Sequence, residues 1–353
     1  MWSQIATTLI HGAVYARRYL TRPATGNVYM NLEHYCNQFT HLKRAPNSVF
    51  PELTKRKAPH KPLLLLAIMD MVKRGLITSK FIGITGELTE LTLLFTSYWR
   101  ILMPVTQTSS IAFPFSKMNS EPFWELVSTP DRQITKEAVN SISTVTQLRQ
   151  LALGANLDEE LFILMTNPES RAELTAALLR SCFSEKGCEI LYAEIGSQQD
   201  AYKYSMELER RAHGIDENPI ISLPDSVRNQ GFRRVIVSCY DHRCALCGVR
   251  IVTPEGHTVV EAAHIRPWNK FKDDEIPNGM ALCRLCHWAF DEGLMSVNHD
   301  YNVLLSRQMW AVPNTAGILL TLANRPINRP RDESLWPDPD RLSWHRRNIG
   351  AGL

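Results

Sequence analysis

Four cysteines arranged as two Cys-x-x-Cys pairs constrain this chain more than any other feature. The pairs are Cys244/Cys247 and Cys283/Cys286. Thiolates at this spacing can close a tetrahedral zinc site. His264 lies between the pairs and His287 directly follows the second pair, so both are surplus to a structural zinc site. Histidines beyond those that a structural zinc site needs indicate a catalytic role for this region.

The bulk composition is that of an ordinary globular protein. The chain has 353 residues, of which 44% are hydrophobic and 21% charged, which is enough for two folded domains. Four further cysteines are scattered, and we expect them to be free thiols: Cys36, Cys182, Cys188 and Cys239. The longest apolar run, 63–69, is about a third of a membrane span, and the N-terminus lacks a secretory pattern. We therefore expect a cytoplasmic protein with no membrane partner.

The sequence pattern predicts an α+β protein with two domains. Helical patterns run through 62–75, 87–103 and 157–183, which predicts a mostly helical N-terminal domain over 1–196. An aromatic stretch at 111–115 is expected to interrupt this pattern, and 123–124 to be extended. The polar segment 197–229 is expected to link the domains, because Gly214, Pro219 and Pro224 break regular structure there. The second domain is expected over 230–353, with a hairpin at 295–306.

The residues around the two surplus histidines have the pattern of a catalytic site. Branched residues over 259–265 predict a strand that ends at Arg266-Pro267, which places His264 where a strand gives way to a loop. A histidine there is suited to be a general base. His287 and Asp291 are four residues apart, so a helix would carry both on one face. Imidazole and carboxylate together suit a divalent catalytic ion.

At this point the sequence resembles a known family. The segments CALC, EAAHI and PNGMALCRLCHWAFDEG resemble the HNH, or ββα-metal, endonucleases over about 239–306. The resemblance implies three catalytic residues: His264 as general base, Asn278 as a brace of the loop and His287 as a metal ligand. It also implies structural Zn²⁺ on the four cysteines and a catalytic Mg²⁺, Mn²⁺, Co²⁺ or Ni²⁺.

One position departs from the family pattern. Many members place a metal ligand directly before the general base, where this chain has Ala263. Asp291 is expected to compensate, with Glu261 and the acidic loop 273–275 as weaker candidates. For that loop, solvent-exposed surface is the favoured interpretation. The alternative for the whole region is a noncatalytic zinc module that binds DNA without cutting it.

The N-terminal domain resembles a second family. The segments PHKPLLLLAIMDMVKRG, YWRILMP, FPFSKM, FWELV and LDEELFILMTNPESRAEL resemble the sulfur-binding domain of phosphorothioation-dependent type IV restriction endonucleases, over roughly 31–196. A phosphorothioate sulfur is large, polarizable and a poor hydrogen-bond acceptor, so its recognition needs an apolar cavity beside cations. The resemblance implies the following DNA-binding residues: Phe113, Pro114 and Phe115 as the cavity wall, and Arg56, Lys57, His60 and Lys61 on phosphates.

A structural role is the alternative for the same residues. Phe113 and Phe115 could be core residues on either side of an edge-strand proline, and His60-Lys61 could open a surface helix. The net charge of +3 is too small to decide the matter, although basic residues gather between 43 and 61 and around the first cysteine pair.

The predicted function is a modification-dependent restriction endonuclease. It would recognise phosphorothioated double-stranded DNA and hydrolyse a nearby phosphodiester with one divalent ion, leaving a 5′ phosphate. One HNH site cuts one strand, so a homodimer is a further hypothesis. The alternatives are an HNH enzyme that reads methylated or hydroxymethylated bases, a nonspecific nuclease, and a noncatalytic zinc-containing DNA-binding protein.

Overall fold

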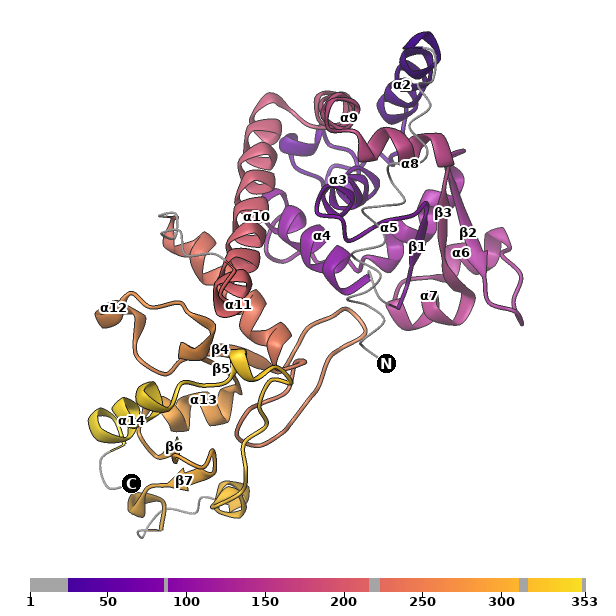
Figure 1. The fold of residues 1–353 in the computed structure, drawn as a ribbon. Helices are drawn as coiled ribbons and strands as arrows, with labels where there is room; N and C mark the ends of the chain where they lie inside the picture. The colour runs from indigo at the N-terminus through magenta and orange to yellow at the C-terminus, as the bar shows by residue number, and fades with distance from the viewer. Residues whose placement is uncertain (1–24, 86–87, 216–222, 311–316, 351–353) are drawn as a thin grey trace. The chain divides into compact units, whose positions relative to one another are not determined.

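The computed structural model describes residues 25–85, 88–215, 223–310 and 317–350 (Figure 1). The chain divides into two units by its internal packing. The first comprises Met1–Ile84, Ala112–Ile142 and Arg149–Cys188, and the second Thr85–Ile111, Ser143–Leu148 and Glu189–Leu353. Within the described residues, no helix combines the length and the apolar character that a bilayer span requires.

The first unit packs helices around a small antiparallel sheet. Its helices are α2 (Thr25–Thr40), α3 (His60–Lys73), α5 (Ala112–Lys117), α6 (Lys136–Ser141), α8 (Glu159–Thr166) and α9 (Pro168–Cys182), with short 3₁₀ turns at Glu52–Thr54 and Met118–Ser120. The sheet has the order β1 (Phe81–Gly83), β3 (Ala152–Leu157), β2 (Trp124–Ser128). Helix α3 is buried over nearly its whole length and contacts α5, α8 and α9, and it confirms the helix predicted at 62–75.

The aromatic stretch at 111–115 forms a helix rather than only a break. Helix α4 (Leu88–Leu102) ends before it, as predicted, but residues 112–117 then form α5. Pro114 is the third residue of α5, in the first turn, where its missing N–H costs no helical hydrogen bond. Pro114 and Phe115 are buried, whereas Phe113 is partly exposed.

The second unit contains the cysteine pairs. Its helices are α4, α10 (Glu185–Ala212, which begins in the first unit), α11 (Asp225–Cys239), α12 (Trp268–Phe271), α13 (Arg284–Asp291) and α14 (Pro339–Asn348); α7 (Val145–Leu151) spans the division between units. Four 3₁₀ turns complete it: Ile276–Asn278, Arg307–Trp310, Gly317–Leu322 and Glu333–Leu335. Strands β4 (Val260–His264) and β5 (Gly279–Cys283) form one antiparallel pair, and β6 (Met295–Val297) and β7 (Val303–Leu305) form the predicted hairpin.

Helices α10 and α11 share the core of the ββα element. Tyr204 and Leu208 of α10 and Phe232 and Ile236 of α11 are buried with the residues of β4, β5 and α13. Helix α10 continues across residue 196 without a break, so much of the expected connection at 197–229 is helical, and 216–222, including Pro219, lies outside the described residues. The domain boundaries 1–196, 197–229 and 230–353 remain predictions.

Candidate active site

A strand pair followed by a helix holds the predicted catalytic residues. Strands β4 and β5 are in antiparallel register from Val260 opposite Cys283 to His264 opposite Gly279, and α13 follows β5 directly. Helix α11 approaches Gly279 closely: a Cβ there would lie 2.4 Å from Ile236 Cδ1 and 2.9 Å from Phe232 Cζ, so these side chains would have to shift. His264 therefore stands at the end of β4, as the sequence predicts, and α11 packs closely against this end of the strand pair.

The imidazole of His264 is held on one face and at one nitrogen. Its ring stacks on Phe232 with the ring centroids 4.0 Å apart and the planes 6° from parallel. Its Nε2 lies 2.8 Å from Oδ1 of Asp274. The side chain keeps partial exposure, so a substrate water can reach it.

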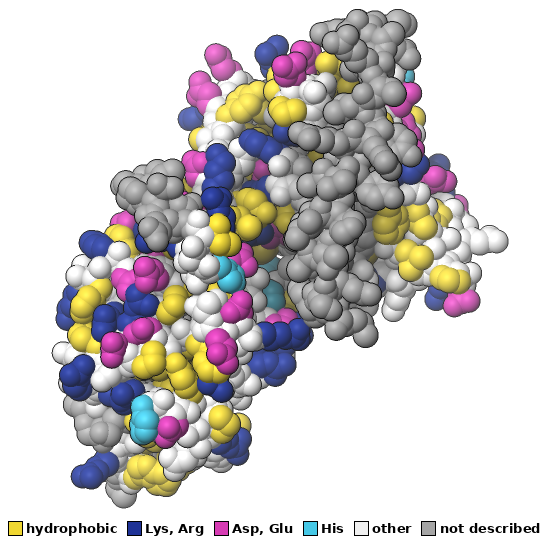
Figure 2. Space-filling model, viewed as in Figure 1, with side chains coloured by type: hydrophobic (Ala, Val, Ile, Leu, Met, Phe, Trp, Pro, Cys, Tyr) yellow, Lys and Arg dark blue, Asp and Glu magenta, His cyan; other side chains and the backbone are white. Residues whose placement is uncertain are grey.

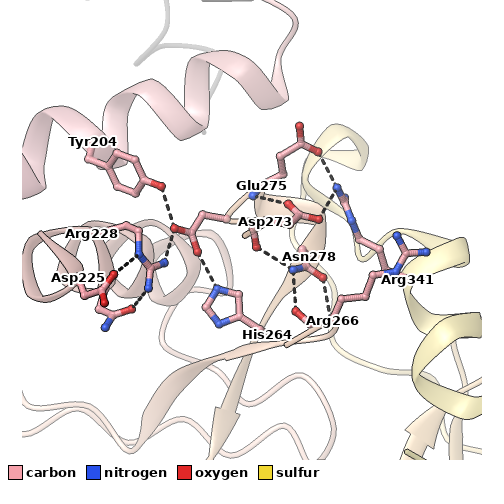
Figure 3. A network of polar contacts seen from close by, with 11 residues as sticks. Tyr204, Asp225, Arg228, His264, Arg266, Asp273, Glu275, Asn278 and Arg341 are labelled. Carbon is pink, nitrogen blue, oxygen red and sulfur yellow. Dashed lines mark hydrogen bonds and ion pairs between the residues drawn. The ribbon is translucent and has the colours of Figure 1, made fainter. Parts of the chain in front are cut away.

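Asp274 is a buried partner of the site, and the expectation of a solvent-exposed acidic loop at 273–275 was wrong for this residue. Asp274 is 2% exposed. Its Oδ2 accepts a hydrogen bond of 2.8 Å from the Tyr204 hydroxyl and pairs with the Arg228 guanidinium (Figure 3). Burial alone would raise the pKa of Asp274, but the hydrogen bonds from His264, Arg228 and Tyr204 outweigh it and lower the pKa. No signal in the local sequence distinguished Asp274 from its acidic neighbours.

Asn278 braces the loop between the two strands. Its Oδ1 accepts from the Arg266 backbone N–H at 2.9 Å, and its Nδ2 donates to the Arg266 and Asp273 carbonyls at 3.1 and 2.8 Å (Figure 3). These are backbone hydrogen bonds of the kind that the family resemblance implies. Arg341 of α14 holds the same loop through Asp273 at 2.9 Å and Glu275 at 2.6 Å.

His287 and Asp291 lie on one face of α13 and fit a divalent ion. His287 Nε2 is 3.5 Å from Asp291 Oδ2, and His287 Nδ1 is 3.9 Å from Glu261 Oε2. An imidazole nitrogen and a carboxylate oxygen at this separation can share one ion, and Glu261 adds a further negative charge near the second ring nitrogen. The structure thus brings together His264, His287 and Asp291 in one ββα element, with Glu261 beside them.

The four cysteines form the predicted cluster. Among the described residues, Cys244, Cys247, Cys283 and Cys286 place their sulfur atoms within 4.8 Å of one another. Cys247 Sγ and Cys283 Sγ are 3.7 Å apart, close to the roughly 3.8 Å between two thiolates that share a tetrahedral zinc ion at 2.3 Å. The cluster joins the loop after α11 to the end of β5 and the start of α13, so a bound zinc would fix the strand against the helix.

A cavity of about 530 Å³ lies in the first unit and includes three of the predicted DNA-reading residues, His60, Lys61 and Phe113. Its apolar wall includes Phe113, Ile134 and Val139. Its basic lining residues are Lys43, Arg44, Lys61, Lys117 and Lys136, and among the described residues that line it none is acidic. Sequence reasoning missed Lys117 and Lys136, which follow no basic run.

The individual lining residues differ in how much charge they offer. Burial lowers the pKa of His60 to about 4, so its ring is neutral at neutral pH and stands edge-on to Phe113 at 4.8 Å. Lys61 is nearly buried and is paired with Glu121. Lys117 Nζ donates to Asn140 Oδ1 at 2.7 Å and lies 5.7 Å from the Phe113 ring centroid. Lys43 and Lys136 are exposed at the rim.

The remaining predicted DNA-reading residues lie outside this cavity lining. Arg56 and Lys57 are exposed, and Arg56 pairs with Glu52 at 3.0 Å. Phe115 is fully buried, with its ring edge-on to Trp124 at 4.9 Å. Phe113 alone of the Phe113-Pro114-Phe115 segment is 38% exposed and lines the cavity.

The charges on the second unit are mixed. Figure 2 shows lysine and arginine side chains interspersed with acidic and hydrophobic ones over the drawn face of this unit. Arg284, at the start of α13, is exposed and lies 3.5 Å from Glu261. Charge alone therefore does not mark a nucleic-acid surface on this face, and the geometry of the site carries the argument.

Comparison with known proteins identifies the cysteine-rich segment. Residues 244–298 match the profile of a family described as HNH endonuclease. Among solved structures, a modification-dependent TagI restriction endonuclease matches with a TM-score of 0.26 and 23% sequence identity, over 40% of this chain and 42% of that chain. No curated protein matches the chain.

Proposed function

We propose that this chain cuts DNA in response to a phosphorothioate modification. It carries an HNH endonuclease domain at residues 244–298 and is, through that domain, a metal-dependent DNA endonuclease. The observation that carries the nuclease assignment is the joint placement of His264, His287 and Asp291 on one ββα element. A noncatalytic zinc module has no need of a histidine and an imidazole–carboxylate pair arranged in this way.

In the proposed reaction, His264 takes a proton from the attacking water. Asn278 and the loop it braces keep the imidazole in place as the substrate enters. His287 and Asp291 would hold the divalent ion, which supplies positive charge to offset the charge that develops on the phosphate oxygens. The four cysteines, with zinc, keep α13 and β5 in register so that the base and the metal ligands face the same phosphate. The product would carry a 5′ phosphate.

Recognition of the modification is assigned to the cavity of the first unit. Substitution of a phosphate oxygen by sulfur keeps the negative charge but weakens hydrogen bonding, so the binding site must combine cations with apolar surface. The cavity has this combination: Lys43, Lys117 and Lys136 supply charge and Phe113 supplies an apolar wall. The neutral ring of His60 beside Phe113 adds aromatic surface to this wall and no positive charge.

Binding of three matched duplexes tests this proposal. The duplexes are unmodified, phosphorothioated in the Rp configuration, and base-methylated, each incubated with the full-length His264→Ala variant without added Mg²⁺ or Mn²⁺, so that none is cut and the structural zinc stays bound. We expect the phosphorothioated duplex to bind at least about tenfold more tightly than the unmodified one, equivalent to about 1.4 kcal/mol. Preference for the methylated duplex would instead support a base reader, and equal binding of all three would contradict modification dependence.

A double-strand break requires that both DNA strands be cut. One HNH site cuts one strand, so a homodimer is proposed for a double-strand break. Sedimentation with the phosphorothioated duplex tests this: we expect two chains per duplex, and one chain per duplex would contradict it.

A further inference from the structure

A buried carboxylate lies directly behind the proposed general base. Asp274 accepts hydrogen bonds from three side chains: His264, Tyr204 and Arg228. We propose that Asp274 is a positioning residue that commits His264 to act as a base through Nδ1, and that Tyr204 and Arg228 hold Asp274 in the orientation that this requires. The inference rests on the proposed nuclease function, and its test separates the two.

The hydrogen-bond directions determine the tautomer of His264. Arg228 and Tyr204 both donate to Oδ2 of Asp274, and an ionised carboxylate has no hydrogen of its own, so it can only accept from His264. The Nε2 of His264, 2.8 Å from Oδ1, must therefore carry the hydrogen. A neutral imidazole has one N–H, which leaves the lone pair on Nδ1 to accept a proton from water.

The ring is also prevented from turning. Phe232 covers one face of His264 in a nearly parallel stack, 4.0 Å between centroids. Rotation of the imidazole about its axis would break both the stack and the hydrogen bond to Asp274. The direction in which Nδ1 points is thus set by two contacts at once, which is the requirement for a base that must meet a water at a defined position.

The residues that hold Asp274 come from outside the segment that matches the HNH profile. Tyr204 lies on α10 and Arg228 on α11, both before residue 244. The Arg228 guanidinium is itself fixed, because it lies 3.7 Å from the Trp268 ring centroid and 3.7 Å from Asp225. In this chain the nuclease site therefore extends beyond the family segment into two preceding helices (Figure 3).

Asp274→Asn gives a sharp test, because the substituted amide must choose its orientation. Two donors, Arg228 and Tyr204, face Oδ2, and one, His264, faces Oδ1. The amide oxygen will turn toward the Arg228 charge, so the amide NH₂ will face His264 Nε2. His264 must then accept at Nε2 and carry its hydrogen on Nδ1, where it blocks the base. The matched control is Asp300→Asn, the same substitution at an exposed acid in the β6–β7 hairpin, where the carboxylate lies 3.2 Å from His299.

The first readout is the single-turnover cutting rate set against DNA affinity, with a phosphorothioated duplex and Mg²⁺ or Mn²⁺. We expect Asp274→Asn to cut on the order of 100-fold more slowly or worse, with its dissociation constant for the duplex within about twofold of wild type. Asp300→Asn should cut within a few-fold of wild type. Equal rates for wild type and Asp274→Asn, with His264→Ala inactive, would overturn the inference and leave the nuclease proposal intact.

The second readout needs neither an added catalytic metal ion nor DNA cleavage. In ¹⁵N-histidine-labelled full chain at neutral pH, long-range ¹H–¹⁵N correlation distinguishes the two neutral tautomers, and His264→Ala identifies the His264 signals. We expect the Nε2–H tautomer in wild type and the Nδ1–H tautomer in Asp274→Asn. An Nδ1–H tautomer in wild type would overturn the inference even if Asp274→Asn fails to fold, and an enzyme that cuts no duplex would sink the proposed function while this readout still decides the tautomer.

Discussion

Asn278 holds the backbone of Arg266 at both of its polar groups. The Arg266 N–H donates to Asn278 Oδ1 at 2.9 Å, and Asn278 Nδ2 donates to the Arg266 carbonyl at 3.1 Å. Arg266 is two residues beyond His264, so this pair fixes the chain at the point where β4 ends and the loop begins. The orientation of the proposed base therefore depends on a fully buried amide on the opposite strand end.

Asn278→Ala should weaken both stability and cutting. The substitution leaves three part-buried backbone groups without their partner, at an expected cost of about 1–3 kcal/mol in the free energy of unfolding. Cutting by the folded protein should fall further, because the loop after His264 loses its brace. Urea unfolding and single-turnover cutting measure the two effects. Asn298→Ala is the control, because it removes two turn hydrogen bonds in the β6–β7 hairpin and should leave cutting by folded protein unchanged.

The cysteine cluster should contain one zinc ion per chain that the second unit needs to fold. Structural zinc sites contribute on the order of 10 kcal/mol of apparent binding free energy, which is comparable to the whole stability of a domain. Cys286→Ser should therefore lose zinc and the cooperative unfolding of this unit, as measured by metal analysis and circular dichroism. Cys239→Ser, outside the cluster, should keep the metal. A metal-free chain with native near-ultraviolet dichroism would contradict the structural role.

His345 should make the protein less stable in mild acid. Its ring is fully buried against Phe290, with Nδ1 2.9 Å from the Ser296 hydroxyl and Nε2 3.0 Å from the Phe290 carbonyl. Burial lowers its pKa from 6.5 to about 4, an effect that outweighs the opposing hydrogen bond to Phe290. Between those values the unfolded chain binds a proton that the folded chain excludes, so stability is complete above pH 6.5 and declines as the pH falls toward 4.

The expected loss from this one group is about 2 kcal/mol between pH 6.5 and pH 5. Urea unfolding of wild type and His345→Gln across this range isolates it, because glutamine does not titrate. The variant should be less stable at pH 7 but should show a shallower decline with acid. Identical declines in the two proteins would exclude His345 as the source.

Phe113 should contribute to modification binding without contributing to general DNA affinity. Its ring lines the cavity beside Lys117, and its removal deletes apolar surface that only a sulfur atom would exploit. Phe113→Ala should weaken binding of the phosphorothioated duplex about tenfold and leave binding of the unmodified duplex unchanged. Phe81→Ala is the matched control, because Phe81 is equally exposed, at 38%, and lies outside the cavity lining. Equal effects of the two variants would argue against the cavity as the reader.

Local sequence patterns predicted the parts of the site whose geometry is set by local structure. The Cys-x-x-Cys spacing gave the cluster, branched residues gave the strand that ends at His264, and the four-residue spacing of His287 and Asp291 placed both on one face of α13. In each case a short segment with one dominant conformation decides where the side chain lies.

The partners of Asp274 could not be predicted in this way. Tyr204 and Arg228 are 70 and 46 positions away along the chain, and only the packing of α10 and α11 against the strand pair brings them to this carboxylate. From sequence, three consecutive acids at 273–275 have the pattern of solvent-exposed surface. Asp273 and Glu275 instead pair with Arg341 of α14, and Asp274 turns inward. Burial of a polar residue by distant elements leaves no local signal.

The decisive experiment compares the initial rates at which wild type and His264→Ala cut matched phosphorothioated and unmodified duplexes in Mg²⁺ or Mn²⁺. We expect wild type to cut the phosphorothioated duplex at least about tenfold faster than the unmodified one, and His264→Ala to cut neither while still binding the modified duplex. Equal cutting of both duplexes by wild type, or undiminished cutting by His264→Ala, would contradict the proposed function.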